Sequence, residues 1–239
     1  MTMNTRLRFS KDVEYDLLVP PYGQDYYSMT PKQVKDNFEW FISKIPERID
    51  YLINRCAKDL KVSVDKFDYS PESLKLIWRW LLKTVKIEKV PKDQLDEMVK
   101  QWGHLGKESK MINYEQLTVA SQFIIRDIGM YLGEVYTNHF PTVTWGYFTK
   151  PKNNVFANRP VLFGIFVKAS DLLYNHPLEP IYATEGLALN VIDKKQSEMD
   201  LYDFFLKCVN HYFIFDKYPE GIAAFKYDNK GQLDNQLLV

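Results

Sequence analysis

Across residues 113–139, which include a long apolar run, large apolar side chains recur at the spacing of an α-helix. The apolar positions are Leu117, Ala120, Ile124, Ile128, Tyr131, Leu132 and Val135. The middle of the run is apolar on nearly every side, which is typical of a helix that is buried all round. We therefore predict a central helix over 113–139, ended by Pro141, against which the rest of the chain packs.

The period of the sequence changes directly after Pro141. Val143, Trp145 and Tyr147 alternate with residues 144, 146 and 148, which is typical of a strand. Turn residues at 150–154 and 158–160 separate further short apolar segments at 155–157 and 161–166. The region predicts a small antiparallel meander of two or three strands.

Helical spacing also marks most of the remaining chain. Thr30 and Pro31 begin a segment that extends to about residue 60, which we expect to form two helices or one helix kinked at Pro46. Ser70 and Pro71 predict the N-cap and first turn of the next helix. Further helices are expected at 91–102, 170–175, 179–191 and 198–215, with a last strand at 221–227.

These elements predict an α+β fold: a mostly helical single domain with a small antiparallel sheet of about three or four strands packed on the long central helix. We expect residues 1–28 to form an N-terminal arm, residues 29–228 the domain, and residues 229–239 a tail.

Composition argues against several functions. Lys and Arg number 31 and Asp and Glu number 31, so the basic excess usual for nucleic-acid or membrane-surface binding is absent. Neither a signal peptide nor an apolar segment of membrane-spanning length is present, so we expect a cytoplasmic protein. Cys56 and Cys208 lie in apolar helical patterns, typical of buried thiols in a reducing compartment. No Cys or His cluster has zinc-site spacing, and we expect neither a metal nor a cofactor.

Gly129 and Gly133 lie four residues apart within the predicted central helix, so they share one face. Each glycine costs roughly 1 kcal/mol relative to alanine, and we expect close approach of another element to compensate. Asp127 and Glu134 share a face two turns apart, about 10 Å along the axis, which is too far for one ion. We expect both carboxylates to bond to backbone amides of the following loop or to Arg or Lys. The alternative is a polar active site formed with His139.

Charge is unevenly distributed after the central helix. The segment between Val135 and Ser170 contains no acidic residue, and its cations are Lys150, Lys152, Arg159 and Lys168. The segment 169–193 contains no basic residue, and its acids are Asp171, Glu179, Glu185 and Asp193. The two segments either pair with each other or leave a docking face for an acidic protein. That face would comprise Trp145, Tyr147, Lys150, Lys152 and Arg159.

Four stretches together resemble a known group of proteins. They are SPESLKLIWRWL (70–81), DIGMYLGEVY (127–136), Trp145 and NRPVLFGIF (158–166). In this order they resemble a loose group of uncharacterised bacterial cytosolic proteins, some of them similar to immunity proteins of toxin systems. The resemblance covers roughly residues 68–190 and implies a helical body with a small sheet. The group has no functional residues to carry over to this chain.

Three functions remain open from the sequence. The first is a non-enzymatic, immunity-type protein-binding module that acts through a patch on the 143–168 meander. The second is an enzyme of unrecognised class that uses Asp127, Glu134 and His139, although no nucleophile elbow or phosphate-binding loop is present. The third is a self-associating protein that uses the aromatic helix at 198–216; the oligomeric state stays open.

Overall fold

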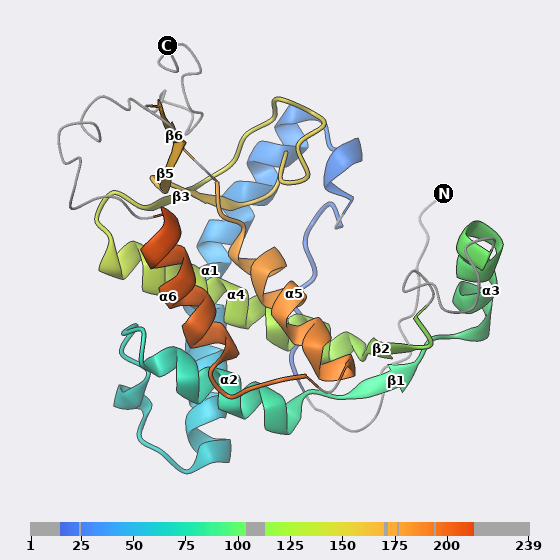
Figure 1. Cartoon of the computed structure of the whole chain (residues 1–239), viewed down its shortest axis with the longest axis horizontal. Coiled ribbons are helices and arrows are strands. Elements are labelled where there is room, and N and C mark those ends of the chain that lie inside the picture. The colour runs from blue at the N-terminus through green and yellow to red at the C-terminus, as the bar shows by residue number, and fades with distance from the viewer. Residues whose placement is uncertain are drawn as a thin grey trace.

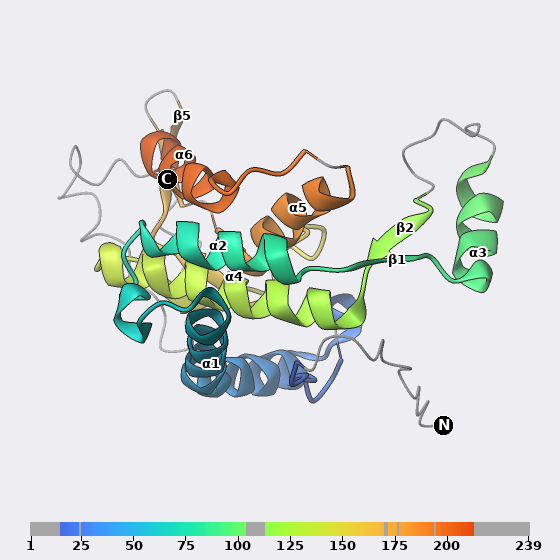
Figure 2. The ribbon, with the colours of Figure 1, turned by 90° about the horizontal axis from the view of Figure 1, so that it is seen from below.

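A buried helix, α4 (Val119–His139), runs through the middle of the molecule (Figure 1). The computed structural model describes residues 15–23, 25–103, 113–169, 172–175, 177–193 and 195–212. Figure 2 shows α4 between α1 on one side and α5 and α6 on the other, with α2 beside it. The surrounding helices are α1 (Pro31–Leu60), α2 (Ser73–Thr84), α5 (Pro180–Ile192) and α6 (Asp200–Tyr212). The predicted α+β, mostly helical fold is confirmed.

Helix α4 begins at Val119, and the prediction that it begins at residue 113 is wrong. Residues Glu115–Leu117 form strand β2, which pairs antiparallel with β1 (Ile87–Lys89), an element the sequence did not indicate. The Thr118 hydroxyl then accepts a hydrogen bond from the Ser121 amide and caps the helix. The pairing with β1 therefore decides where the helix starts.

Helix α1 is one continuous helix through Pro46, which resolves the two alternatives for residues 31–60. Its start agrees with the sequence: Thr30 and Gln33 form a capping box and Pro31 occupies the first turn. Pro46 lies on the exposed face, where the carbonyl that it leaves without a helical partner can be hydrated.

Helix α2 begins at Ser73, after a turn that contains Ser70 and Pro71. The amide and hydroxyl of Ser73 both donate to the Ser70 carbonyl, at 3.1 and 2.6 Å. The predicted N-cap role of the Ser70 side chain is therefore wrong, because the chain makes one more turn before the helix.

The strands pair in three separate two-stranded antiparallel sheets within the described residues, not in one meander. Besides β1 and β2 they are β3 (Thr144–Gly146) with β4 (Val161–Phe163), and β5 (Phe166–Ala169) with β6 (Leu172–Asn175).

Three local predictions in this region are wrong. Residues 155–157 lie in turns, and residues 172–175 form a strand where a helix was expected. The expected strand 161–166 is interrupted by Gly164, whose φ of +85° breaks the extended backbone and separates β4 from β5.

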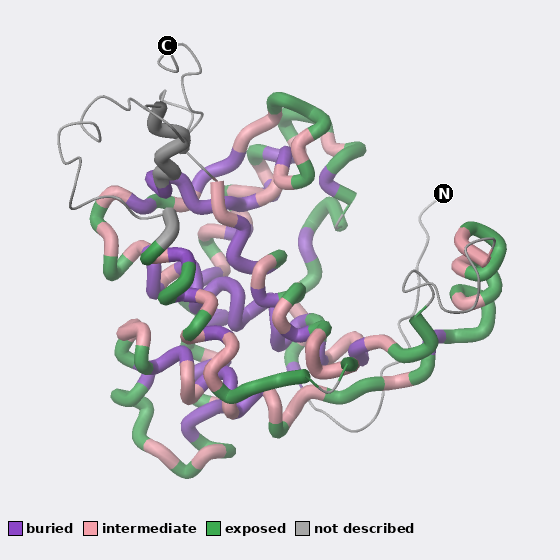
Figure 3. Tube along the Cα trace, in the orientation of Figure 1, coloured by how far each residue is buried: buried purple, intermediate pink, exposed green. Residues whose placement is uncertain are grey.

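The core lies along α4 and includes buried residues of all four surrounding helices (Figure 3). The aromatic face of α6 contributes to it: Leu201 and Phe205 are buried, and the Phe205 and Tyr136 rings lie 4.8 Å apart. Part of this face therefore packs inside the protein, while Leu206 of the same helix is 37% exposed. Residues 213–216 of the expected helix lie outside the described residues. The expected last strand at 221–227 and the tail from 229 lie outside the described residues.

Helix α3 (Lys92–Trp102), flanked by β1, lies apart from the body (Figure 1). It contains no buried residue, although its apolar residues recur on one face. Among the described helices, none is long and apolar enough to cross a membrane.

Candidate functional site

Asp127 is completely buried and is bound by two side chains from other parts of the chain. Arg48 of α1 donates to Asp127 Oδ2 from Nη2 at 2.6 Å and from Nε at 3.1 Å. The Tyr15 hydroxyl donates to the same oxygen at 2.6 Å. The expectation that Asp127 pairs with a basic side chain is confirmed, and the pair joins α1, α4 and the N-terminal segment.

Glu134 and His139 lie in different surroundings from Asp127. Glu134 accepts a hydrogen bond from Trp145 Nε1 at 2.8 Å, a partner that differs from the expected backbone amide or cation. His139 is exposed, and its ring contacts the edges of Phe140 and Phe205. The structure therefore does not bring these three groups together at one site.

The five residues of the predicted docking face also separate. Trp145 packs on Gly133 and Phe41, and Tyr147 is buried beside Phe38 with ring centroids 5.1 Å apart. The remaining three are cations: Lys150 and Lys152 are exposed, whereas Arg159 is engaged in an ion pair.

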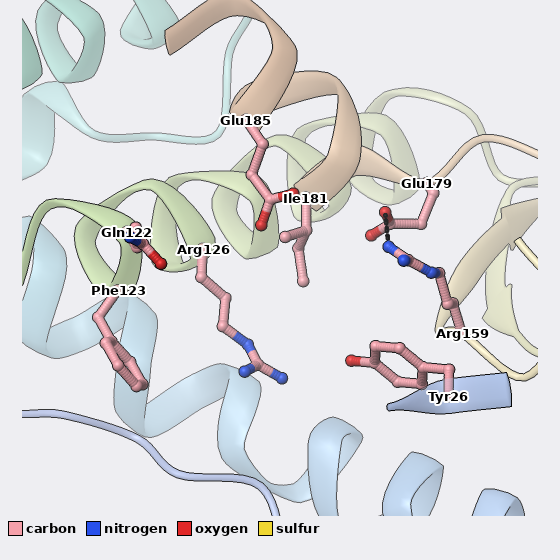
Figure 4. A pocket seen from close by; sticks show the side chains of 8 residues that line it. All are labelled: Tyr26, Gln122, Phe123, Arg126, Arg159, Glu179, Ile181 and Glu185. Atoms are coloured by element: carbon pink, nitrogen blue, oxygen red, sulfur yellow. Dashed lines mark ion pairs between the residues drawn. The ribbon is translucent and has the colours of Figure 1, made fainter. Parts of the chain in front are cut away.

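Arg159 pairs with Glu179, with Nη1 3.5 Å from Oε2. This contact pairs one cation of the basic segment with one acid of the acidic segment, whereas Lys150 and Lys152 make no ion pair with a described residue. It also forms one wall of a cavity of about 130 Å³, which we call the arginine cavity (Figure 4). The cavity is lined by Tyr26, Gln122, Phe123, Arg126, Arg159, Glu179, Ile181 and Glu185.

Gly129 explains why α5 lies close enough to α4 to form this cavity. A Cβ atom on Gly129 would lie 2.6 Å from the Cα of Ile181, in the first turn of α5. The predicted close approach at the glycines is confirmed here and at Gly133, where a Cβ would lie 2.6 Å from Cη2 of Trp145. The first turn of α5 therefore lies directly over the polar side chains that α4 presents.

Arg126 is 5% exposed and extends from α4 into the arginine cavity (Figure 4). Its Nε is buried without a hydrogen-bond partner, and the guanidinium makes no ion pair or hydrogen bond with any residue in the described part of the chain. Its neighbour Asp127 points to the other side of α4, toward Arg48. The fold therefore holds a buried cation that the described side chains leave without a counter-charge in contact.

Glu179 is 3% exposed and has two roles in the site. Its side chain caps α5 by accepting from the Tyr182 amide at 2.8 Å, and it pairs with Arg159. Burial raises the pKa of Glu179 to about 7, while Arg159 opposes this shift and Glu185 adds to it. Near neutral pH the carboxyl group is therefore only partly ionised, and the cavity carries a net positive charge.

Tyr26, from the short 3-10 helix Tyr26–Ser28, closes the cavity opposite α4. Its carbonyl accepts from Asn158 Nδ2 at 2.8 Å, and its ring lies 5.0 Å from the Arg159 guanidinium. Its hydroxyl points toward Arg126 in Figure 4 and has no hydrogen-bond partner among the described residues. Burial raises the pKa of Tyr26, so this hydroxyl keeps its proton and can donate it.

Sequence reasoning identified Arg159, Glu179 and Glu185 as charged residues but missed Tyr26, Gln122 and Arg126 as members of a site. One signal was present: Arg126 is a cation within the apolar run that predicts the buried helix. A single carboxylate, Asp127, stands beside it, and Asp127 is used by Arg48. That Arg126 has no carboxylate in contact becomes evident only once the Arg48–Asp127 pairing is known.

Comparison of the chain with protein-family models, curated proteins and solved structures finds no match in any of the three. Within the described residues, no group of three or more His, Cys, Asp or Glu side chains is placed to hold a metal ion.

Proposed function

We propose that this chain is a non-enzymatic binding protein that takes a small anionic ligand in the arginine cavity. The observation that carries the proposal is the buried guanidinium of Arg126, which has no partner among the described residues. Glu185 and Asp127 interact with Arg126 electrostatically without a direct contact. An anionic ligand in direct contact with the guanidinium would therefore offset more of the cost of burying this charge. The planar guanidinium presents paired N–H donors that match a carboxylate or a phosphate.

The remaining lining supports an anion in this position. The Tyr26 hydroxyl is a free donor, and Arg159 is a second guanidinium whose Nε lacks a partner among the described side chains. A water molecule needs roughly 10–15 Å³ measured in the same way, so a cavity of about 130 Å³ accepts a head group of several heavy atoms. No described lining residue is a serine, cysteine or histidine, so the common nucleophiles are missing from the lining.

The test is titration calorimetry with sodium acetate and with sodium phosphate, supported by thermal unfolding. We expect saturable binding of at least one anion, with a stabilisation of about 1.4 kcal/mol at roughly ten times Kd. Arg126→Met should abolish it while the variant stays folded, because the substitution also removes the buried charge. The matched control is Lys83→Met, which removes an exposed cation from α2 and should bind as the wild type does. Binding by Arg126→Met equal to that of the wild type would overturn the proposal.

A second candidate function is the immunity-type protein-binding module, which we also propose as a hypothesis. The observation that favours it is the loop 148–158. Lys150 and Lys152 are exposed there without an ion pair to a described residue, and Val155 is 55% exposed. The loop is closed by a hydrogen bond from the Asn158 amide to the Phe148 carbonyl at 2.7 Å, so its shape is set before any partner binds.

Affinity capture from the native lysate, read by mass spectrometry, tests this second function. The wild type is compared with Lys150→Glu/Lys152→Glu and with Lys66→Glu/Lys92→Glu, a charge-matched pair of exposed lysines on other elements. One stoichiometric acidic partner that is lost only with the first pair supports the module. An unchanged set of captured proteins argues against the loop as its surface.

A further inference from the structure

A second, larger hollow adjoins the arginine cavity. It is a groove of about 420 Å³, and it shares two lining residues, Gln122 and Glu185, with the arginine cavity. Its apolar lining comes from five elements or their edges: Val90, Met98, Leu117, Ile125, Leu189 and Ile192. We call it the apolar groove. The groove is also lined by the polar residues Asn113, Glu115 and Gln116. The two spaces share Gln122 and Glu185, with a cation on one side and a lining that includes these aliphatic side chains on the other.

The junction presents hydrogen-bond acceptors. The amide nitrogen of Gln122 donates to the Leu117 carbonyl at 3.0 Å, which leaves its Oε1 as the free end of the side chain. The Glu185 carboxylate points toward the cavity in Figure 4 and makes no hydrogen bond or ion pair with a described residue. Both side chains are exposed, so they are open to a ligand, and the carboxylate is best matched by a cationic donor.

The spacing of these groups limits the ligand. Gln122 and Arg126 are four residues apart on α4, so they lie on one face, about 6 Å apart along the helix axis. A ligand that contacts both side chains at once therefore carries its anionic group and its cationic group only a short distance apart. An α-amino acid has this separation between its carboxylate and its ammonium group.

Resting on the proposed anion site, we infer that the ligand is a free α-amino acid with an aliphatic side chain. Its carboxylate binds Arg126 and the Tyr26 hydroxyl, and its ammonium group binds Glu185 and Gln122 Oε1. Its side chain enters the apolar groove beside Leu117, Ile125 and Leu189. In this arrangement one ligand contacts the unpartnered cation, the unpartnered acceptors and the adjoining apolar surface.

The test is calorimetry with L-leucine beside compounds that lack one or two of its three groups. Glycine lacks the side chain, 4-methylpentanoate lacks the ammonium group, 3-methylbutylamine lacks the carboxylate, and acetate keeps the carboxylate alone. We expect leucine to bind at least tenfold more tightly than any of the four. Glu185→Gln should weaken leucine at least tenfold and leave 4-methylpentanoate unchanged or stronger. Glu97→Gln on α3 is the control and should have no effect.

Leu189→Ser tests the groove, and because Leu189 is 55% exposed we expect the variant to fold. It should weaken leucine and leave glycine and acetate unchanged. If leucine binds no better than acetate, the amino-acid inference fails while the anion site stands. If neither these compounds nor phosphate bind, both fail. If Leu189→Ser changes the oligomeric state in sedimentation and leaves leucine binding unaltered, the groove is a contact between copies of the chain and the inference is overturned.

Discussion

At the residue scale, two arginines are buried among the described residues, and they are in contrasting states. Arg48 and Asp127 have side chains 3% and 0% exposed and neutralise each other through three hydrogen bonds, whereas Arg126 has no such partner among the described residues. A satisfied buried pair is a structural element, and an unsatisfied buried cation is a candidate binding group. The two neighbours Arg126 and Asp127 therefore differ in role because they point to opposite sides of one helix.

The paired state predicts a large loss of stability when one partner is removed. Asp127→Asn leaves the Arg48 charge buried, and we expect it to lower the free energy of unfolding by about 3 kcal/mol. Urea denaturation measures this. The control is Glu39→Gln in the exposed pair Lys35–Glu39, both side chains 62% exposed, which should change stability by less than about 0.5 kcal/mol. Equal effects of the two variants would contradict the structural role of the pair.

Glu179 predicts a pH dependence of stability. Its pKa is about 7 in the folded protein, against an ordinary value of 4.5. The folded state therefore holds the proton more tightly than the unfolded state, and this stabilisation is complete below pH 4.5 and is lost as the pH rises to 7. The groups that face Glu179 are Arg159, Glu185, Tyr26 and Arg126.

We expect the stability of the wild type to fall by about 3 kcal/mol relative to Glu179→Gln between pH 4.5 and 8. Glutamine keeps an oxygen that can cap α5, so the comparison isolates the ionisation. Urea denaturation at a series of pH values gives the measurement. Parallel pH profiles for the two proteins would show that Glu179 titrates with an ordinary pKa.

At the scale of elements, α4 is approached closely by its neighbours at two glycines, which have no side chain. The Trp145 ring lies on Gly133, and Trp145 Nε1 donates to Glu134 one residue further along the helix. The absence of a side chain at Gly129 likewise allows the first turn of α5 to lie against α4, and this positions Glu179. The two glycines in one helix thus position β3 and α5.

Alanine substitution distinguishes a glycine that is required for close packing, Gly133, from one where a side chain fits, Gly186. Gly133→Ala should destabilise the protein by about 2 kcal/mol, because the added methyl group displaces the Trp145 ring and its hydrogen bond. Gly186→Ala in α5 meets no atom within 4 Å, so it should stabilise by about 0.5–1 kcal/mol. Thermal unfolding of both variants gives the signs, and stabilisation by Gly133→Ala would rule out the close contact.

At the scale of the whole molecule, burial divides the chain into a core and a projecting part. Helix α4 has fourteen buried residues, whereas α3 has none. Elements with few buried contacts open at a small fraction of the global free energy of unfolding. The projecting helix therefore depends little on the stability of the body.

Hydrogen exchange of the intact protein should reveal this division. We expect the amides of α3 to exchange several orders of magnitude faster than those in the middle of α4. Helix α2, of ordinary length but with six buried residues, serves as the internal comparison and should exchange slowly. Equal protection of α3 and α2 would mean that α3 is covered in solution, for example by a partner or a second copy.

Local physics made much of the fold readable from the sequence. The N-cap at Thr30, the apolar period of α4 and the packing role of its glycines follow from backbone geometry within a few residues. The arginine cavity does not, because Tyr26, Arg126, Arg159 and Glu179 are dispersed along the chain and meet only after α5 closes on α4. The first residue of α4 was predicted wrongly for the same reason, because the pairing of β1 with β2 competes with helix formation there. The sequence by itself determined the helices and the buried face of α4, because hydrophobic spacing is local. Only the tertiary structure decided which buried charge is paired and which is left for a ligand, because that depends on contacts between distant residues.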